Sequence, residues 1–262
     1  MGVVNASADS FSEERHASAD FALARGLAHL DCGADLLDIG GESTRPGAAE
    51  VSGDLEKMRV IPVVKNLKKV HPEVILSVDT RHGDVARAAL AAGAEIINDV
   101  SMLRHSPEIA ELVARYDAGL ILSHSRGVPA DMAQYTDYSG AVAEVVAEEL
   151  AAAKAEAVKA GVREENIMLD PGFGFAKTAE QCWELAETLE KVAPLSRMLV
   201  GVSRKSFLGA LTGEADPLRR GGESLALELL LAAGGVGMIR THGVRELRNG
   251  LLVLRRMGGK MQ

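Results

Sequence analysis

Three polar side chains each follow a short run of apolar residues: Asp79, Asn98 and Asp170. Two carboxylates and an amide together supply hydrogen-bond acceptors and donors that can lie in one plane. Such a set suits the edge of an aminopyrimidinone-type ring, which is rich in N–H donors. Because Asp170 precedes a proline, and Asp-Pro pairs also cap turns, a purely structural role for Asp170 is the alternative.

A second group of polar side chains is cationic and comes later in the chain. Lys205 follows an apolar run that ends at Ser203, and Arg240 and His242 lie at the end of the last such run. These side chains predict an anion-binding corner, because barrel enzymes often bind phosphate near their seventh and eighth strands. Lys205 could instead form a Schiff base, or be a surface residue at the start of a helix.

Two segments are too polar for simple short turns. Gly40–Gly47 reads Gly-Gly-Glu-Ser-Thr-Arg-Pro-Gly, which predicts a mobile loop that can close over a substrate. We expect Asp9–Ser12 to behave in the same way. Phe11 is then either an exposed apolar tip of that loop or a buried anchor beneath it.

The elements that must position these groups are short apolar runs, rich in β-branched residues, that alternate with amphipathic helices. Such alternation indicates a parallel sheet covered by helices. Eight units in 262 residues predict a closed (β/α)₈ barrel, whose active face lies at the carboxyl ends of the strands. The alternative is an open doubly wound sheet, but no Gly-x-Gly-x-x-Gly turn follows the first strand. The predicted strands are Gly2–Asn5, Asp35–Gly40, Val74–Asp79, Glu95–Asp99, Gly119–His124, Asn166–Asp170, Met198–Ser203 and Val236–Thr241.

Local signals place several of the helices. Ala141–Ala160 is rich in Ala, Glu and Lys, which are strong helix formers. Ser106 followed by Pro107 predicts an N-cap with proline at the first helical position. Thr178 and Gln181 have the spacing of a capping box.

Composition bounds the class of protein. Hydrophobic residues make up 47% of the chain, enough for a sizeable core. A formal net charge of −8 argues against a general nucleic-acid binder, which usually carries a basic stripe. No run of about 18 uncharged apolar residues predicts a membrane span, and the start of the chain does not resemble a secretory signal. Cys32 and Cys182 are interpreted as reduced residues of a cytoplasmic protein.

Taken together, the polar segments resemble the dihydropteroate synthase family of pterin-binding enzymes. They occur in the family's order and spacing over nearly the whole chain, and the Gly-Glu-Ser-Thr-Arg-Pro-Gly loop is highly specific. The segments are Met1–Asn5 with Asp9–Ser12, Asp38–Gly47, Ser77–Arg81, Ile97–Val100, His124–Gly127, Asp170–Thr178, Gly201–Ser206 and Arg240–His242.

The resemblance implies a (β/α)₈ barrel that spans residues 1–262 as a single domain. It implies a transferase of folate biosynthesis, which joins 6-hydroxymethyl-7,8-dihydropterin diphosphate to 4-aminobenzoate and releases pyrophosphate. It also implies Mg²⁺ as the cofactor and a homodimer, with small-molecule substrates and no nucleic-acid or membrane partner.

The resemblance further implies a role for each matching residue. Mg²⁺, Arg240 and His242 would neutralise the departing diphosphate, and Asp79 and Asp170 would stabilise positive charge on the pterin methylene. The pterin would be held by Asp79, Asn98, Asp170 and Lys205. The diphosphate would be held by Asn5, Arg240 and His242, with the metal on Asn5. The aminobenzoate would be held by Thr44, Arg45, Pro46, Phe175, Lys205 and Ser206. The catalytic residues would be Asp79, Asp170, Lys205, Arg240 and His242.

Several positions depart from the family's pattern. Ser7 and Ala8 replace a Thr-Pro pair, and a later glycine pair is missing, so we expect altered dynamics of the first loop. Ser123 stands where methionine is usual, and Gly243 replaces an aspartate that can orient His242. Two alternatives stay open: a pterin-binding paralogue with weak or no synthase activity, and a related pterin-dependent methyltransferase. The retained aminobenzoate loop argues against the methyltransferase.

The resemblance raises two further expectations. Phe175, Pro46 and Ser206 match the sulfonamide-sensitive form of the family, so we hypothesise sulfonamide sensitivity. The helix predicted over Val244–Met257 could contribute to a subunit interface, or it could pack against its own barrel. The leucines on one face of this helix are Leu247, Leu251 and Leu254.

Overall fold

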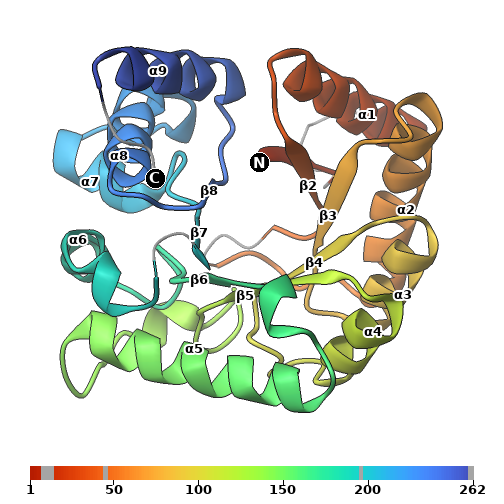
Figure 1. The fold of residues 1–262 in the computed structure, drawn as a ribbon, viewed down its shortest axis with the longest axis horizontal. Coiled ribbons are helices and arrows are strands. Elements are labelled where there is room, and N and C mark those ends of the chain that lie inside the picture. Colours follow the sequence, from red (N-terminus) through yellow and green to blue (C-terminus); the bar gives the residue numbers. More distant parts are fainter. Residues whose placement is uncertain (7–14, 44–46, 195–196, 259–262) are drawn as a thin grey trace.

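The structure, a computed structural model, describes residues 1–6, 15–43, 47–194 and 197–258 of the chain. Its strands run through the centre of the molecule and its helices lie outside them (Figure 1). β1 to β6 form a parallel sheet in sequential order, and β7 pairs in parallel with β8. The strands are β1 (Gly2–Asn5), β2 (Leu36–Gly40), β3 (Ile75–Asp79), β4 (Ile96–Asp99), β5 (Gly119–Ser123), β6 (Ile167–Asp170), β7 (Leu199–Val200) and β8 (Met238–Ile239).

Short main-chain contacts join the two sheets into a closed ring. Leu169 of β6 bridges Met198, which precedes β7, and Gly2 of β1 bridges Thr241, which follows β8. Val3 donates its N–H to the Thr241 carbonyl at 3.1 Å. The predicted (β/α)₈ barrel is therefore confirmed, and the open doubly wound sheet is wrong.

The first six predicted strands match the observed strands to within one residue at each end. The last two, Leu199–Val200 and Met238–Ile239, are shorter at both ends than the predicted Met198–Ser203 and Val236–Thr241. After β7, Arg204 adopts a left-handed conformation with φ of 62°. After β8, the Gly243 N–H donates to the Thr241 hydroxyl at 3.0 Å and forms a tight turn.

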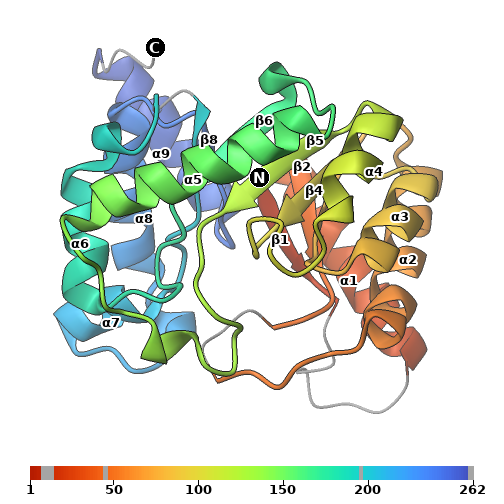
Figure 2. The same cartoon turned by 90° about the horizontal axis from the view of Figure 1, so that it is seen from below.

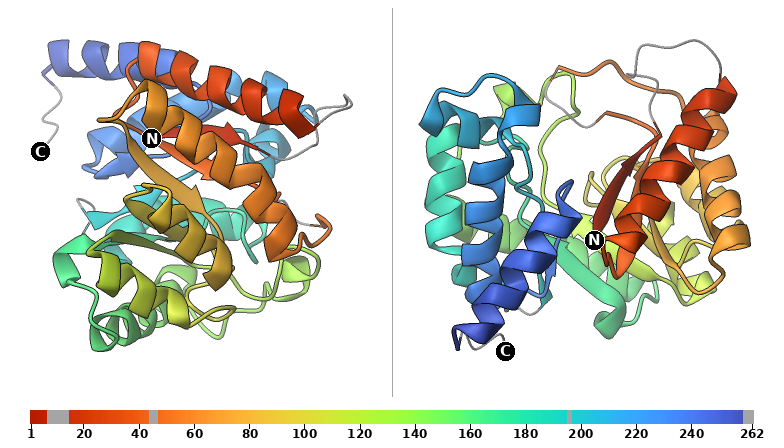
Figure 3. Two further views of the ribbon diagram at one scale, coloured as in Figure 1. Left: turned by 90° about the vertical axis from the view of Figure 1, so that its right-hand side faces the viewer. Right: turned by 90° about the horizontal axis from the view of Figure 1, so that it is seen from above.

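Helices surround the strands on all sides, as Figure 2 and Figure 3 show from three further directions. None of the described helices is long and apolar enough to cross a membrane. The helices are α1 (Arg15–Asp31), α2 (Gly53–Val70), α3 (Gly83–Ala91), α4 (Glu108–Tyr116), α5 (Val142–Lys159), α6 (Ala179–Glu187), α7 (Ser206–Thr212), α8 (Gly221–Ala233) and α9 (Val244–Arg256), with 3₁₀ turns η1 (Met132–Gln134), η2 (Glu164–Asn166), η3 (Leu189–Lys191) and η5 (Pro217–Arg219).

One of the two predicted helix caps is confirmed and the other is wrong. Thr178 Oγ1 accepts from the Gln181 N–H at 3.2 Å, and Gln181 Oε1 accepts from the Thr178 N–H at 2.8 Å, which is the predicted capping box of α6. Ser106 does not cap α4 with its side chain. Its hydroxyl accepts instead from the N–H of Gly83, the first residue of α3, at 3.1 Å. Ser106 therefore ties two neighbouring helices together.

The barrel interior is layered along its axis. An apolar cluster of Leu36, Ile121 and Leu199, near the amino ends of the strands, contacts Ile96, Met168 and Met238 from the strands between them. Because side chains alternate along a strand, the next inward positions toward the carboxyl ends include Asp38, two residues after Leu36. The apolar layer fills one end of the barrel and leaves the polar side chains at the other.

The leucine-bearing face of α9 packs against its own barrel. Leu247 is buried in the main core, and Leu251 lies against it. The Leu252 and Val253 side chains point to solvent, with exposed fractions of 54% and 63%. Two of the three leucines on this face, Leu247 and Leu251, therefore pack against the chain's own barrel.

Gly172, which follows Asp170 in the turn after β6, provides a stability test. Its φ is 69°, and a Cβ there would lie 1.8 Å from the His124 carbonyl oxygen. We predict that Gly172→Ala lowers the free energy of unfolding by at least about 3 kcal/mol, because strain and a main-chain clash add. Urea denaturation measures this loss.

The matched control is Gly213→Ala at the end of α7. Gly213 has a similar φ of 79°, but a Cβ there meets nothing within 4 Å. Its replacement should therefore cost only the conformational strain of about 1–2 kcal/mol. Equal losses in the two variants would show that the contact with His124 is not tight.

Candidate active site

A chain of hydrogen bonds crosses the mouth of the barrel at the carboxyl ends of the strands. Arg240, just after β8, donates from Nε to Asp38 Oδ2 at 2.6 Å and from Nη2 to Asp79 Oδ2 at 3.1 Å. Asp38 also accepts from Ser77 Oγ at 2.6 Å and from Asn98 Nδ2 at 3.2 Å. The five residues of this network come from β2, β3, β4 and the end of β8, so barrel closure brings them together.

Ser123 continues this chain from β4 to β6. Its Oγ lies 3.2 Å from Asn98 Oδ1 and 3.1 Å from Asp170 Oδ2, two acceptors that share a single hydroxyl proton. Asp170 Oδ1 accepts from the Gly172 N–H at 2.8 Å. Asp170 therefore caps its own turn and also faces the cluster, so the two interpretations of this residue are compatible. The structure brings Asp79, Asn98 and Asp170 to one end of the barrel.

Burial governs the charge of this cluster. It raises the pKa of Asp79, while Arg240 acts in the opposite direction and Asp38 raises the pKa further. Asp79 is 7% exposed and Asp38 is fully buried, so two carboxylates share one guanidinium away from bulk water. Carboxylates in such a setting favour a partner that brings N–H donors or positive charge.

Lys205 and Phe175 form the wall beside the cluster. Lys205 Nζ donates to the Phe173 carbonyl and lies 4.1 Å from the centre of the Phe175 ring. Burial lowers the pKa of Lys205. Ser206, next in the chain, is the exposed first residue of α7. The other predicted aminobenzoate residues, Thr44, Arg45 and Pro46, lie outside the described residues.

The two ends of the loop over residues 43–50 are tied to each other. Glu42 accepts from Nε and Nη2 of Arg81, both at 3.1 Å, and from the Val51 N–H at 3.0 Å. Arg81 also donates to Glu50 at 2.8 Å. Loop closure over a substrate stays a prediction, and the first loop, with Phe11, lies outside the described residues.

His242 and Asn5 flank the seam at which β8 meets β1. His242 donates its backbone N–H to Ser203 Oγ at 3.2 Å, and its Nδ1 lies 3.1 Å from the same oxygen. Burial, followed by the charge of Arg240, lowers the pKa of His242 to about 3. Asn5 is the exposed last residue of β1. Within the described ranges, no group of three His, Cys, Asp or Glu side chains is arranged to hold a metal ion.

Lys177 supports the loop that carries Phe175, a role that the motif alone did not indicate. Its Nζ lies 2.9 Å from His124 Nδ1 and donates to the carbonyls of Gly172 at 3.1 Å and Phe175 at 3.2 Å. Burial lowers the pKa of Lys177 to about 7. This one buried side chain therefore ties the loop, through the Gly172 and Phe175 carbonyls, to His124.

Asp38 and Ser77, which begin two of the family-like segments, and Ser123 also belong to the polar network, but the sequence indicated no binding role for any of the three. Asp38 and Ser77 lie inside β2 and β3, two residues before the strand ends. The available signal was the carboxylate of Asp38 itself, because a buried charge needs partners. Ser123 was noted only as a departure from a family pattern.

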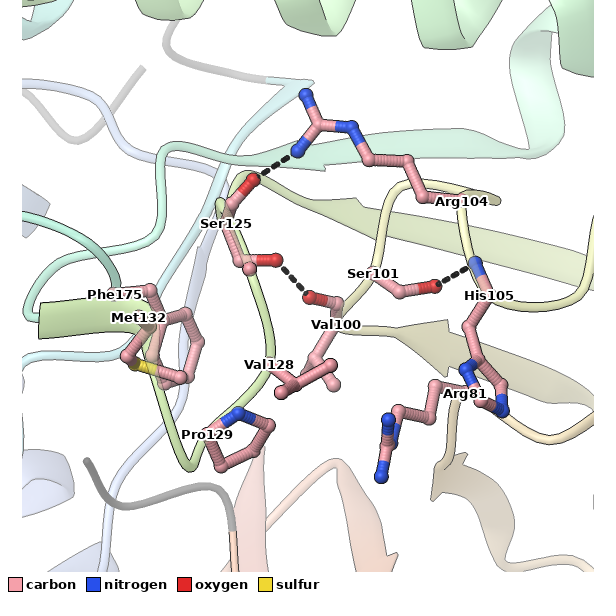
Figure 4. A pocket seen from close by; sticks show the side chains of 11 residues that line it. Arg81, Val100, Ser101, Arg104, His105, Ser125, Val128, Pro129, Met132 and Phe175 are labelled. Atoms are coloured by element: carbon pink, nitrogen blue, oxygen red, sulfur yellow. Dashed lines mark hydrogen bonds between the residues drawn. The ribbon is translucent and has the colours of Figure 1, made fainter. Parts of the chain in front are cut away.

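A cavity of about 280 Å³ is lined by residues that follow β3, β4 and β5, among them Arg81, Ser101 and Ser125 (Figure 4). Phe175 and Met132 form one wall, and Arg81 and His105 lie on the opposite side. Phe175 is the only predicted site residue among those that line the cavity in the described part of the chain. Within the polar network, the Arg240 side chain lies against both Asp38 and Asp79 and forms an ion pair with each.

Known proteins resemble this chain over nearly its whole length. Curated dihydropteroate synthases include that of Synechocystis, 39% identical over 250 residues (94% of this chain, 86% of the relative), and that of Mycobacterium leprae, 41% identical over 262 residues (97% and 91%). The Xanthomonas albilineans dihydropteroate synthase solved with 4-aminobenzoic acid has a TM-score of 0.90 and 38% identity, with 98% of this chain and 92% of that chain covered.

A second solved structure extends the likeness to a bound product. The Burkholderia cenocepacia dihydropteroate synthase complexed with 7,8-dihydropteroate has a TM-score of 0.87 and 38% identity, with 100% of this chain and 92% of that chain covered. The family model described as pterin binding enzyme matches residues 1–242, which include every strand of the barrel. This chain therefore belongs to the pterin-binding enzyme family.

Proposed function

We propose that this protein is a dihydropteroate synthase of folate biosynthesis. It joins 4-aminobenzoate to 6-hydroxymethyl-7,8-dihydropterin diphosphate and releases pyrophosphate. The observation that carries the proposal is the network from Arg240 through Asp38 and Asn98 to Asp170, which offers carboxylate and amide groups around one barrel mouth. The likeness to curated dihydropteroate synthases along nearly the full chain supports it.

The pterin ring binds to Asp79, Asn98 and Asp170 in this proposal, and Lys205 lies beside it. A dihydropterin presents several N–H donors along one edge, which match the acceptors of two carboxylates and an amide. Burial raises the pKa of Asp79, so a bound N–H donor replaces the proton that this carboxylate otherwise takes up. The pterin therefore satisfies groups that are costly to leave without partners.

The reaction proceeds by departure of the diphosphate, which leaves positive charge on the pterin methylene. Arg240 and His242 hold the leaving group, and the carboxylates of Asp79 and Asp170 stabilise the positive charge as it develops. The arylamine of 4-aminobenzoate is neutral and attacks this carbon without a strong base. Closure of the loop over residues 43–50 excludes water, which would otherwise capture the cation.

The aminobenzoate binds against Phe175 and Ser206, with Thr44, Arg45 and Pro46 from the closing loop. The solved Xanthomonas albilineans relative contains 4-aminobenzoic acid, which supports a site for that substrate in this fold. The solved Yersinia pestis dihydropteroate synthase forms a complex with a sulfonamide drug. We infer that sulfonamides compete with 4-aminobenzoate for the same residues here.

We propose that Mg²⁺ binds together with the diphosphate, at Asn5. Mg²⁺ commonly takes only one or two protein ligands and keeps waters and substrate phosphates as the rest. The exposed amide of Asn5 at the end of β1 fits such a partial site, although the described residues build no complete metal cage. The ion would neutralise charge on the leaving diphosphate.

We also propose that the protein is a cytoplasmic homodimer. Three leucines on neighbouring elements are largely exposed: Leu211 of α7, Leu218 of η5 and Leu230 of α8, at 68%, 71% and 70%. We take these exposed apolar side chains as the candidate association surface, because large apolar side chains in contact with water favour burial against a partner. A cytoplasmic location is supported by Cys32 and Cys182, which are both free thiols.

Pyrophosphate release tests the proposed function directly. The purified protein should release pyrophosphate from the dihydropterin diphosphate when 4-aminobenzoate is present. Asp79→Asn and Lys205→Ala should each lower kcat/KM by at least about tenfold, roughly 1.4 kcal/mol of transition-state stabilisation. Asp54→Asn, at an exposed position at the start of α2, is the control and should leave the rate unchanged.

Tight pterin binding without pyrophosphate release would show an inert paralogue instead. Methyl transfer in place of pyrophosphate release would identify the related methyltransferase. Wild-type kinetics in folded Asp79→Asn and Lys205→Ala proteins would remove both residues from the site.

The Mg²⁺ proposal predicts a changed metal requirement. Asn5→Ala should raise the Mg²⁺ concentration needed for half-maximal activity by about tenfold, because one oxygen ligand is lost. A titration of pyrophosphate release against Mg²⁺ measures this change, with Asn249→Ala on α9 as the control. Full activity of the wild-type protein in excess chelator would contradict the proposal.

The homodimer proposal predicts the mass of the protein in solution and a substitution that should convert the dimer to a monomer. Light scattering should give twice the chain mass of 27.7 kDa. Leu230→Asp should yield a monomer, because a charge in an apolar interface is costly to bury. Phe21→Asp on α1, a position that is 60% exposed, should leave the dimer intact. A monomeric wild-type protein would refute the proposal.

A further inference from the structure

The turn that carries Phe175 has a strained backbone. Three of its residues, Gly172, Gly174 and Ala176, have positive φ angles of 69°, 74° and 48°. Alanine rarely adopts this region, because its Cβ crowds the neighbouring backbone, so the conformation of Ala176 is costly. A strained segment keeps its shape only when the surrounding structure holds it there. Two sets of side-chain contacts reach this turn from other parts of the chain.

The first set, the Lys177 support, runs through a buried imidazole. Lys177 Nζ donates to the carbonyls of Gly172 and Phe175 at 3.1 Å and 3.2 Å, and it lies 2.9 Å from Nδ1 of His124. His124 is fully buried just after β5. Its Nε2 lies 3.3 Å from Oε2 of Glu149 on α5, although the two groups are not aligned as a hydrogen bond. The imidazole therefore stands between Lys177 and the carboxylate of Glu149.

The second set, the Tyr138 support, reaches the other end of the turn. The Tyr138 hydroxyl donates to the Ala176 carbonyl at 3.0 Å. The guanidinium carbon of Arg126 lies 4.1 Å from the centre of the Tyr138 ring, and Arg126 Nη1 donates to the neighbouring Asp137 carbonyl at 2.7 Å. Arg126 also donates from Nε and Nη2 to Glu149 Oε1 at 3.1 Å and 2.5 Å. Glu149 therefore lies at the far end of this support as well.

The carboxylate of Glu149 joins the two supports. Its Oε1 accepts from Arg126, while its Oε2 lies near His124 and accepts from Arg104 Nη2 at 2.6 Å. The contact with His124 lowers the pKa of Glu149, burial opposes that effect, and Arg126 and Arg104 lower the pKa further. The group is therefore ionised at neutral pH. Without this negative charge, two guanidinium groups would face each other beside a buried imidazole.

We propose that Glu149 is a positioning residue for the aminobenzoate end of the site, because its carboxylate fixes the Phe175 turn through both supports. Phe175 is the wall against which 4-aminobenzoate binds in the proposed function, and the effect on substrate rests on that function. The order of the turn itself does not. A wall that is already in place reduces the ordering cost of binding. The side chains of Asp79 and Asn98, which come from β3 and β4, are held by other contacts.

Amide hydrogen exchange of the free protein tests the order of the turn without any substrate. Glu149→Gln keeps the size of the side chain, but its neutral amide has one acceptor oxygen in place of two. The Phe175 amide, which donates to the Gly172 carbonyl at 3.1 Å, should exchange at least about tenfold faster than in the wild type, because the turn opens more often. The amide of Val78 in β3 should exchange at an unchanged rate.

The matched control is Glu148→Gln, one residue earlier on the same helix. Glu148 is exposed to solvent, so its replacement should leave the exchange of Phe175 as in the wild type. An equal acceleration in the Glu148→Gln and Glu149→Gln proteins would show that the cause is a general change in α5, and it would overturn the proposal.

Steady-state kinetics give a readout that a general loss of stability would not produce. In Glu149→Gln the KM for 4-aminobenzoate should rise by about tenfold, as expected for the loss of about one hydrogen bond to a charged group. The KM for the dihydropterin diphosphate and the kcat at saturation should both stay within about twofold of the wild type. Partial unfolding would instead lower kcat and leave the ratio of the two KM values unchanged.

A second variant covers the case in which Glu149→Gln does not fold. Tyr138→Phe removes only the hydroxyl that donates to Ala176, so exchange of Phe175 and the KM for 4-aminobenzoate should each rise by about threefold, as for one neutral hydrogen bond. In the double variant the combined rise should be smaller than the product of the single ones, because Glu149 acts partly through Tyr138. A purely multiplicative rise would contradict that connection.

The outcomes separate this proposal from the proposed function. Wild-type exchange of the Phe175 amide in folded Glu149→Gln overturns the proposal, whether or not the protein releases pyrophosphate. Faster exchange with an unchanged KM for 4-aminobenzoate overturns the role of Glu149 in substrate binding. If the turn loosens as expected but the wild type releases no pyrophosphate, the proposed function fails and the ordering of the turn by Glu149 is confirmed.

Discussion

The ion pair of Arg240 with Asp38 and Asp79 is the interaction on which the candidate site depends. It joins the last strand to the second and third, across 202 and 161 residues of sequence. The pair forms only if β8 returns to β1, and the bridge between Gly2 and Thr241 makes that closure. Two buried carboxylates would be costly without this guanidinium, so barrel closure and site chemistry support each other.

The mouth of the barrel combines carboxylates and cations within an acidic molecule. The chain carries a net charge of −8, and the mouth contains the carboxylates of Asp38, Asp79 and Asp170. An anionic diphosphate therefore needs the local cations Arg240 and Lys205, together with donors such as His242. Because a ring of barrel strands alternates inward and outward side chains, carboxylates and cations from different strands can stand within one mouth.

Much of the site was predictable because parallel strands end on one face. Asp79, Asn98 and Asp170 each end an apolar run, and barrel closure places such ends together. The hydrogen-bond partners of Asp38 and Ser123 were not predictable, because a single polar residue within an apolar run does not reveal whether its side chain points inward. The prediction that Ser106 caps α4 was wrong because its hydroxyl accepts a hydrogen bond from the Gly83 N–H of the neighbouring helix α3. The sequence of α4 alone does not show this contact between helices.

A crystal structure of the protein with 7,8-dihydropteroate tests the central claim most directly. The account predicts that the pterin N–H groups donate to Asp79, Asn98 and Asp170, with Arg240 still paired to Asp38 and the aminobenzoyl ring against Phe175. A pterin ring bound away from these three side chains, for example in the cavity between Arg81 and Met132, would contradict it.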